Sequence, residues 1–153
     1  MPAYKAPLRD FDFVLNEVIQ VQNVIPSLPG YEEATQDVFA SYLEAAAKFC
    51  ENELAPINRA ADEEGCSFNP ADHSVTTPAG FKEAYQQYCE LGFTGLDCDP
   101  AYGGQGMPKV LAFPMMEMQC SANVAWAMYP GLRHGPYSAI HAHGTEEQKA
   151  TYL

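Results

Sequence analysis

Basic residues are scarce in this chain, which has 8 Lys and Arg against 20 Asp and Glu and a formal net charge of −12. Nucleic-acid binding depends on Lys and Arg that neutralise phosphates, so this balance argues against a nucleic-acid partner. Anionic lipid headgroups attract basic segments, so it also argues against binding to a membrane surface. Because the acidic residues are spread along the chain, we interpret them as a solvated surface.

Paired cysteine motifs and targeting segments are also missing. The 5 cysteines are widely spaced and include no CxxC pair, which excludes a disulfide framework and a structural zinc signature. We therefore expect reduced thiols in a cytoplasmic protein. The N-terminus lacks the apolar core of a secretory signal. The weakly charged stretch at 110–132 is interrupted by prolines and polar residues, so it predicts a buried helix rather than a membrane span.

Strand patterns are missing too, since no segment sustains the alternation of apolar and polar residues that is typical of a strand. Apolar residues instead recur at helical spacing, as in the stripe from Val38 to Leu54. The sequence predicts an all-α bundle of about five to six helices, with an irregular loop at 66–80. We divide the chain into an N-terminal extension at 1–30, with a short amphipathic helix and a linker, and a helical domain at 31–153.

Helix ends are marked by proline, glycine and one capping motif. Pro56 predicts a break or a kink, Gly92 suits a C-terminal cap, and Pro108 suits the first position of a new helix. Two apolar helices are expected after it, the second interrupted near the YPG stretch, and the first apolar on nearly all sides and therefore central. Thr145 followed by Gln148 predicts a capping box at the start of the last helix.

The stretch PAYGGQGMP at 100–108 raises the question of phosphate binding, because glycine-rich loops often cradle phosphates. A dinucleotide-binding fingerprint needs a preceding strand and a third glycine where this chain has Lys109, and a P-loop needs Gly-Lys-Ser/Thr. Neither pattern is present, so we predict a close-packed turn between helices whose glycines adopt positive φ. The residues of this structural loop are Tyr102, Gly103, Gly104 and Gly106.

Histidines and a lone glutamate are the remaining candidates for chemistry. His134, His141 and His143 lie close in sequence but lack HxxxH or HxxH spacing, so we expect no metal site and interpret them as solvated or capping residues. A Ser–His–Asp site has no local signature. Glu117 is either a buried, paired carboxylate or a polar group at the wall of a ligand pocket. Tyr102 is either a core aromatic or a pocket lid.

Several motifs follow one another in a characteristic order. ELAPIN precedes LGFTGLDCDPAYGGQGM, and an apolar helix with Glu117 then leads to HGTEEQKATYL. This order resembles the N-terminal helical domain of the acyl-CoA dehydrogenases over about 35–153, although the glycine loop is one residue shorter than the common Pro-x-x-Tyr-Gly-Gly-x-Gly form. The extension at 1–30 is similar to that of a bacterial subset, which includes enzymes related to 3-methylmercaptopropionyl-CoA dehydrogenase.

The resemblance implies an FAD-dependent oxidoreductase of fatty acid metabolism, which dehydrogenates acyl-CoA thioesters between the α and β carbons. It further implies a β-domain and a C-terminal helical bundle absent from this sequence, electron-transfer flavoprotein as a partner, and a homo-oligomer. We expect the chain alone to be a catalytically inactive fragment with no catalytic base and no bound FAD. We also expect it to expose an apolar face where the missing domains dock. By position, the residues of the acyl-pocket wall are Met116, Glu117, Cys120 and Ser121.

Two alternatives stay open. A non-catalytic helical protein-interaction module would explain the helices and the acidity, but it would not explain the order of the motifs. A relative such as an acyl-CoA oxidase or a flavin monooxygenase would share the scaffold and differ in its chemistry.

Overall fold

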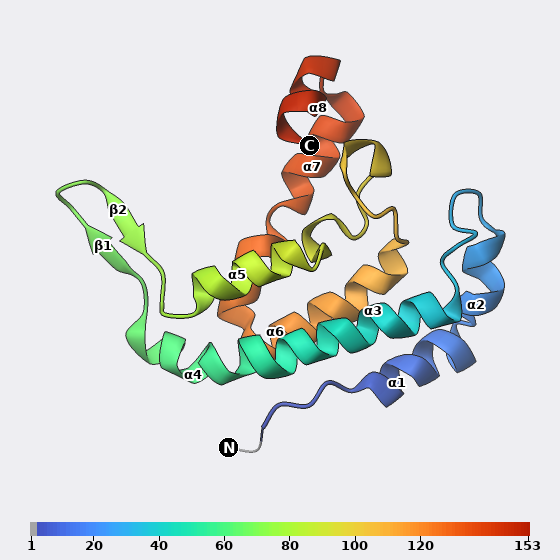
Figure 1. Cartoon of the computed structure of the whole chain (residues 1–153), viewed down its shortest axis with the longest axis horizontal. Helices are drawn as coiled ribbons and strands as arrows, with labels where there is room; N and C mark the ends of the chain where they lie inside the picture. The colour runs from blue at the N-terminus through green and yellow to red at the C-terminus, as the bar shows by residue number, and fades with distance from the viewer. Residues whose placement is uncertain (1–2) are drawn as a thin grey trace.

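The computed structural model describes residues 3–153, and its longest feature is a continuous helical rod (Figure 1). α3 (Gln36–Phe49) runs through the π-helical η3 (Cys50–Leu54) into α4 (Ala55–Glu64). Pro56 lies inside this continuous helix, where it has no N–H to donate, and the wide turn of η3 directly precedes it. The disturbance predicted at Pro56 therefore takes the form of a widened turn in a helix that continues.

An N-terminal arm packs along this rod. α1 (Leu8–Asp12) continues into the π-helical η1 (Phe13–Val18), and the short α2 (Val21–Val24) and η2 (Ile25–Ser27) follow. Phe11 and Leu15 are its buried anchors. The Glu51 carboxylate accepts hydrogen bonds from Lys5 Nζ at 2.7 Å and from the Ala6 amide at 2.9 Å. The arm lies within the predicted extension, whose boundary at residue 30 stays a prediction.

The remaining helices confirm the all-α prediction. They are α5 (Phe81–Glu90), α6 (Lys109–Gly131), α7 (His134–His143) and α8 (Glu146–Tyr152), with the 3₁₀ turns η4 (Phe93–Gly95) and η5 (Pro100–Tyr102). The capping box is confirmed, since Thr145 Oγ1 accepts from the Gln148 amide and Gln148 Oε1 from the Thr145 amide. Within residues 3–153, the helices are too short or too polar to cross a membrane.

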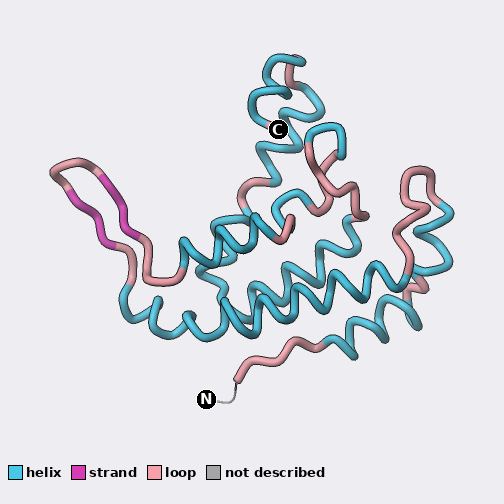
Figure 2. The backbone as a smooth tube through the Cα atoms, viewed as in Figure 1, coloured by secondary structure: helices cyan, strands magenta, loops and turns pink. Residues whose placement is uncertain are grey.

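A small hairpin departs from the sequence prediction (Figure 2). β1 (Ser67–Asn69) pairs antiparallel with β2 (Ser74–Thr76), with Phe68 opposite Val75. The irregular loop predicted at 66–80 is therefore wrong for these residues. Every residue of both strands is exposed, so the alternation that marks a strand packed on a core never arises in this sequence.

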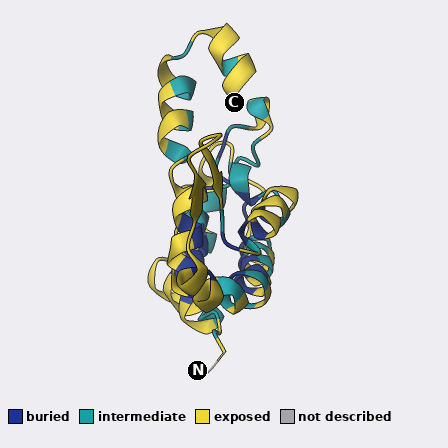
Figure 3. Ribbon diagram, turned by 90° about the vertical axis from the view of Figure 1, so that its left-hand side faces the viewer, coloured by how far each residue is buried: buried dark blue, intermediate teal, exposed yellow. Residues whose placement is uncertain are grey.

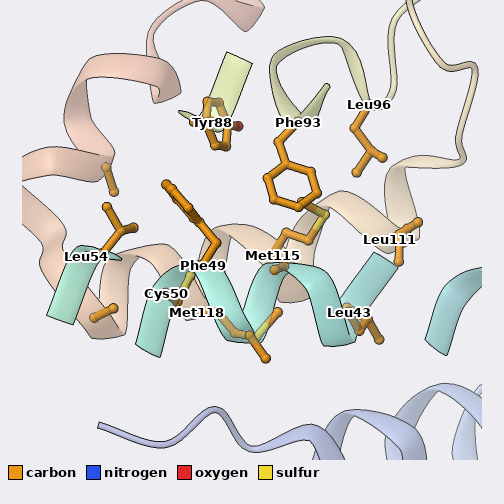
Figure 4. Packing of buried hydrophobic residues seen from close by; sticks show 14 of the residues in the cluster. Leu43, Phe49, Cys50, Leu54, Tyr88, Phe93, Leu96, Leu111, Met115 and Met118 are labelled. Atoms are coloured by element: carbon orange, nitrogen blue, oxygen red, sulfur yellow. The ribbon is translucent and has the colours of Figure 1, made fainter. Parts of the chain in front are cut away.

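The core lies between the rod, α5 and α6 (Figures 3 and 4). The Trp126 ring lies 5.6 Å from that of Phe49 and 5.4 Å from that of Tyr88, between ring centroids, in edge-to-face contacts. Trp126 Nε1 donates a hydrogen bond to the Phe81 carbonyl at 3.2 Å, which satisfies the polar atom of a buried ring. The inner face of α6 adds Leu111, Met115 and Met118, all buried.

A bend divides α6 at Asn123, whose φ of −161° and ψ of 88° are not helical. Asn123 is buried, and its Oδ1 accepts a hydrogen bond from the Trp126 amide at 3.0 Å, so it caps the second half of α6. Its Nδ2 donates to the Leu54 carbonyl on the rod at 3.3 Å. One side chain therefore both bends α6 and ties it to the rod, near the helix boundary expected from the sequence.

The burial of Cys50 leads to a chemical prediction. Its side chain is fully buried, and burial raises the pKa of the thiol to about 12. Alkylation needs the thiolate, so at about pH 8 we expect Cys50 to stay unmodified in the folded chain while the exposed Cys66, Cys89 and Cys120 react with iodoacetamide. Mass mapping of the labelled peptides checks this, with alkylation in denaturant as the control. Equal labelling of Cys50 and Cys120 in the folded chain would contradict the packing.

Candidate functional site

The glycine loop, which we define as residues 92–106, is held together by its own backbone. The amides of residues 103–106 all donate hydrogen bonds to carbonyl groups inside the loop, at 2.8 to 3.1 Å between nitrogen and oxygen. A phosphate cradle needs several free amides that point at one anion. Because these four amides already have carbonyl partners, the loop does not provide such a cradle.

The glycines of this loop have two separate physical roles. Gly103 and Gly106 have φ of 84° and 64°, in the left-handed region that glycine adopts without strain. Gly104 has an ordinary φ, but an ideal Cβ there would overlap the carbonyl group of Cys98. Tyr102 is half-buried, with its ring 5.9 Å from that of His141. The loop is thus a tight connection that leads into α6.

Gln105 joins the two ends of the glycine loop and fastens the loop to α3. Its Nε2 donates a hydrogen bond to the Gly92 carbonyl, just beyond α5, at 2.8 Å. Its Oε1 accepts a hydrogen bond from the Tyr42 hydroxyl on α3. Sequence reasoning missed this residue, because a glutamine between glycines carries no pattern that distinguishes a structural amide from a solvated one.

Polar side chains of α7 face the glycine loop. His141 Nε2 lies 2.9 Å from Asp99 Oδ2, and His134 Nδ1 lies 3.6 Å from Asp97 Oδ2. The hydrogen bond with His141, together with one from the Ala101 amide, lowers the pKa of Asp99 below its ordinary value. Both imidazoles are 41% exposed, as expected of solvated side chains, and each also faces a carboxylate of the loop, which the sequence did not predict. Within residues 3–153, no group of three His, Cys, Asp or Glu could hold a metal ion.

The predicted pocket residues lie on one exposed face of α6. This α6 stripe consists of Phe113, Met116, Glu117, Cys120, Ser121, Val124 and Met128. Its apolar members are 51% to 63% exposed, although the opposite face of the same helix is buried. The central position expected for this helix therefore holds for its inner face only, and the alternative of a buried and paired Glu117 is wrong. That Glu117 belongs to a pocket wall stays a prediction.

A cleft of about 340 Å³ opens beside the first half of α6. Apolar side chains form most of its lining, among them Phe93 and Phe113, and Met116 is the one predicted pocket residue that reaches it. Lys109 and Arg133 contribute cationic groups to the same cleft. Hollows of about 360 Å³ beside the arm and 470 Å³ beside the hairpin contain none of the predicted site residues. Asp97 lines the cleft as well, 4.0 Å from the Arg133 guanidinium, so the cationic end is partly neutralised. The apolar lining and the excess of cationic groups suit a ligand that joins an apolar chain to an anionic group.

Comparison with known proteins identifies the family. The family described as acyl-CoA dehydrogenase, N-terminal domain, matches residues 40–153. This chain belongs to the acyl-CoA dehydrogenase family. The match confirms the resemblance seen in the order of the motifs, from the glycine loop to the last helix.

Several acyl-CoA dehydrogenases are similar to this chain. It is 33% identical to 3-methylmercaptopropionyl-CoA dehydrogenase of Ruegeria pomeroyi, over 98% of this chain and 25% of that protein. It is 32% identical to a butyryl-CoA dehydrogenase of Syntrophomonas wolfei, again over 98% of this chain and 25% of that protein. It is 30% identical to the broad-specificity linear acyl-CoA dehydrogenase FadE5 of Mycobacterium tuberculosis, over 97% and 24% respectively. The chain therefore spans about a quarter of the length of these relatives.

The acyl-CoA dehydrogenase family implies FAD, and the glycine loop of this member does not fit its diphosphate. The four loop amides that would have to bind the phosphate oxygens are already donors to loop carbonyls. A fixed set of internal hydrogen bonds must break before these amides can bind an anion, at a cost that a preformed cradle avoids. The loop is therefore a structural connection that leads into α6, and it is not a phosphate site.

Proposed function

We propose that this chain forms one wall of the acyl pocket in an FAD-dependent enzyme that dehydrogenates acyl-CoA thioesters. The α6 stripe is the observation that carries the proposal. Its apolar side chains point away from the core in a continuous row, and such rows usually mark a surface that a ligand or another part of a protein covers. The glycine loop directly precedes α6 and so fixes where this row lies.

The cleft supports an acyl-CoA as the substrate class. The cleft meets the α6 stripe at Phe113 and Met116, so an acyl chain would lie along the stripe and enter the cleft, gaining roughly 0.8 kcal/mol for each buried CH₂ group. Lys109 and Arg133 offer charge-assisted hydrogen bonds to an anionic group at the same cleft. Cationic side chains are scarce in this chain, whose net charge is −12, so two of them at one cleft support an anionic ligand.

The remaining parts of the proposal concern the whole protein. We assign the catalytic base and most of the FAD site to residues outside this chain, because the chain spans about a quarter of the length of the acyl-CoA dehydrogenases that it matches. Electron-transfer flavoprotein is the proposed electron acceptor and a homo-oligomer the proposed assembly. The free cysteines support a cytoplasmic location, since reducing compartments keep thiols unpaired.

Bulky substitutions on the α6 stripe test the pocket assignment. In the full-length enzyme, Cys120→Trp and Ser121→Trp are expected to lower kcat/KM for long-chain acyl-CoAs on the order of tenfold relative to short-chain ones, because the added rings fill space that the longer chains need. Cys89→Trp is the matched control, since Cys89 is also exposed but lies on α5. An unchanged chain-length preference in both stripe variants overturns the assignment.

The choice of electron acceptor tests the reaction class. The full-length protein is expected to oxidise acyl-CoAs with an artificial electron acceptor and to react slowly with oxygen. Rapid oxidation with oxygen as the acceptor would identify an acyl-CoA oxidase. No oxidation of any acyl-CoA with either acceptor would overturn the enzyme proposal in favour of an interaction module.

A further inference from the structure

α7 and α8 are attached to the rest of the chain without burying a single residue of either helix. Figure 3 shows both helices as exposed or intermediate throughout, in contrast to the core below them. Segments with few buried apolar contacts have low local stability and open before the core does. The attachment of this helix pair therefore depends strongly on polar contacts between α7 and the glycine loop.

Two carboxylate–histidine pairs make these contacts. Asp97 faces His134, with 3.6 Å between oxygen and nitrogen, and Asp99 faces His141 at 2.9 Å. The two histidines are seven residues apart, which places them two turns apart on one face of α7. Between them, the Tyr137 hydroxyl accepts a hydrogen bond from the Asp99 amide at 2.7 Å. The pairs thus lie at both ends of a single interface.

Arg133 adds a permanent positive charge at one end of this interface. Its guanidinium lies 4.0 Å from an Asp97 carboxylate oxygen. Further guanidinium contacts, each at 3.5 Å, reach the Phe93 carbonyl and the Cys98 sulfur. With both histidines neutral, Asp97 keeps Arg133 as a cationic partner while Asp99 faces a neutral imidazole, and with both protonated each carboxylate faces a cationic imidazole.

The other titratable groups around the interface belong to residue types that ordinarily change charge in more alkaline solution. These groups are Cys98 and Tyr102 of the loop, Tyr137 of α7, Tyr85 and Tyr88 of α5, and Lys149 of α8. The ordinary pKa values of Cys, Tyr and Lys lie above about 8, whereas that of His lies near 6.5. Burial raises the pKa values of Tyr85, Tyr88 and Tyr137 further. Histidine is the side-chain type whose charge ordinarily changes between about pH 5 and 8.

We propose that Asp97–His134 and Asp99–His141 form a pH-sensitive latch that closes α7 on the glycine loop. Protonated imidazoles make both pairs charge-assisted and hold the latch closed. Loss of these protons leaves neutral imidazoles facing ionised carboxylates, which attract each other less than an ion pair does, and α7 and α8 then separate from the loop more often. Asp97 and His134 also line the cleft, so opening the latch changes the shape and charge of its wall.

Amide hydrogen exchange of the 153-residue chain tests the latch. Protection of residues 134–152 is measured relative to α3, at about pH 6 and pH 8, after correction for the intrinsic exchange rate. We expect the relative protection to fall about two- to fivefold at the higher pH, since an ion pair with a partly exposed histidine contributes at most roughly a factor of two to three. A ratio that does not change with pH overturns the proposal, whatever the activity of the full-length protein.

A double variant, His134→Asn with His141→Gln, identifies the groups responsible. The two amides retain hydrogen-bonding capacity near the positions of Nδ1 and Nε2 but do not titrate, so the pH dependence should disappear. His143→Gln is the matched control, because His143 is an exposed histidine on the same helix, and this variant should keep the full response. Persistence of the response in the double variant overturns the latch.

Nuclear magnetic resonance of the unmodified chain provides a second measurement that needs no substitution. Amide shifts of α7 and of the glycine loop should follow the titration curves of the His134 and His141 imidazoles. Shifts that follow only the His143 curve, or that stay constant from about pH 5 to 8, overturn the proposal even if the double variant fails to fold.

Discussion

Replacement of Trp126 by alanine is expected to lower the free energy of unfolding by about 4 kcal/mol, in the upper range for a large-to-small change in a core. Only 1% of the side chain is exposed, so almost all of its surface makes contacts that alanine would lose. Its ring contacts Phe49 on the rod and Tyr88 on α5, so the substitution leaves a cavity where these helices meet α6. The Phe81 carbonyl also loses its hydrogen-bond donor.

Denaturant unfolding followed by far-ultraviolet circular dichroism measures this effect, because Trp126 is the 1 tryptophan of the chain and its fluorescence disappears with it. Domains are typically stable by only about 5–15 kcal/mol, so the variant should be close to unfolding at room temperature. Trp126→Phe retains ring contacts and should lose about 2 kcal/mol. Tyr152→Ala, at a 72% exposed aromatic, is the surface control and should change stability by less than about 0.5 kcal/mol. Equal losses for Trp126→Ala and Tyr152→Ala would contradict the core assignment.

Helix positions were largely predictable because their signals are local. Thr145 and Gln148 lie three residues apart, so their reciprocal hydrogen bonds follow from the sequence and from helix geometry alone. Gly92 follows α5 with a φ of 74°, as expected of a glycine that ends a helix. The apolar stripe from Val38 onwards predicted the rod, and Pro56 predicted where its regular geometry changes.

The contacts of the candidate site were less predictable because their partners are distant in sequence. Asp99 and His141 are 42 residues apart, and no local pattern relates one to the other. The exposure of Glu117 was also missed, since apolar residues on every side of a helix predict that the whole helix is buried. Sequence periodicity identifies how many faces of a helix are apolar, but not which face the rest of this chain covers.

Replacement of Gly104 by alanine is expected to be the most disruptive substitution in the glycine loop. A Cβ at this position would overlap the Cys98 carbonyl group and would lie 2.7 Å from the Cys98 Cβ. These backbone atoms cannot rotate away as a flexible side chain does, and the same Cys98 carbonyl accepts the Gly106 amide at 2.9 Å. Relief of the overlap must break that hydrogen bond, so we expect a loss of about 3 kcal/mol.

Gly103→Ala is the matched control, because it adds the same methyl group one residue earlier. Gly103 has a φ of 84° and open space around its ideal Cβ. Alanine there costs only the strain of a left-handed backbone conformation, about 1 kcal/mol. Denaturant unfolding compares the two variants, and hydrogen exchange of residues 92–107 shows whether the loop opens. A larger loss in Gly104→Ala means that close packing requires glycine at this position. Equal losses would mean that backbone freedom is the common requirement, and the close approach of Gly104 to Cys98 would then not determine how the loop directs α6.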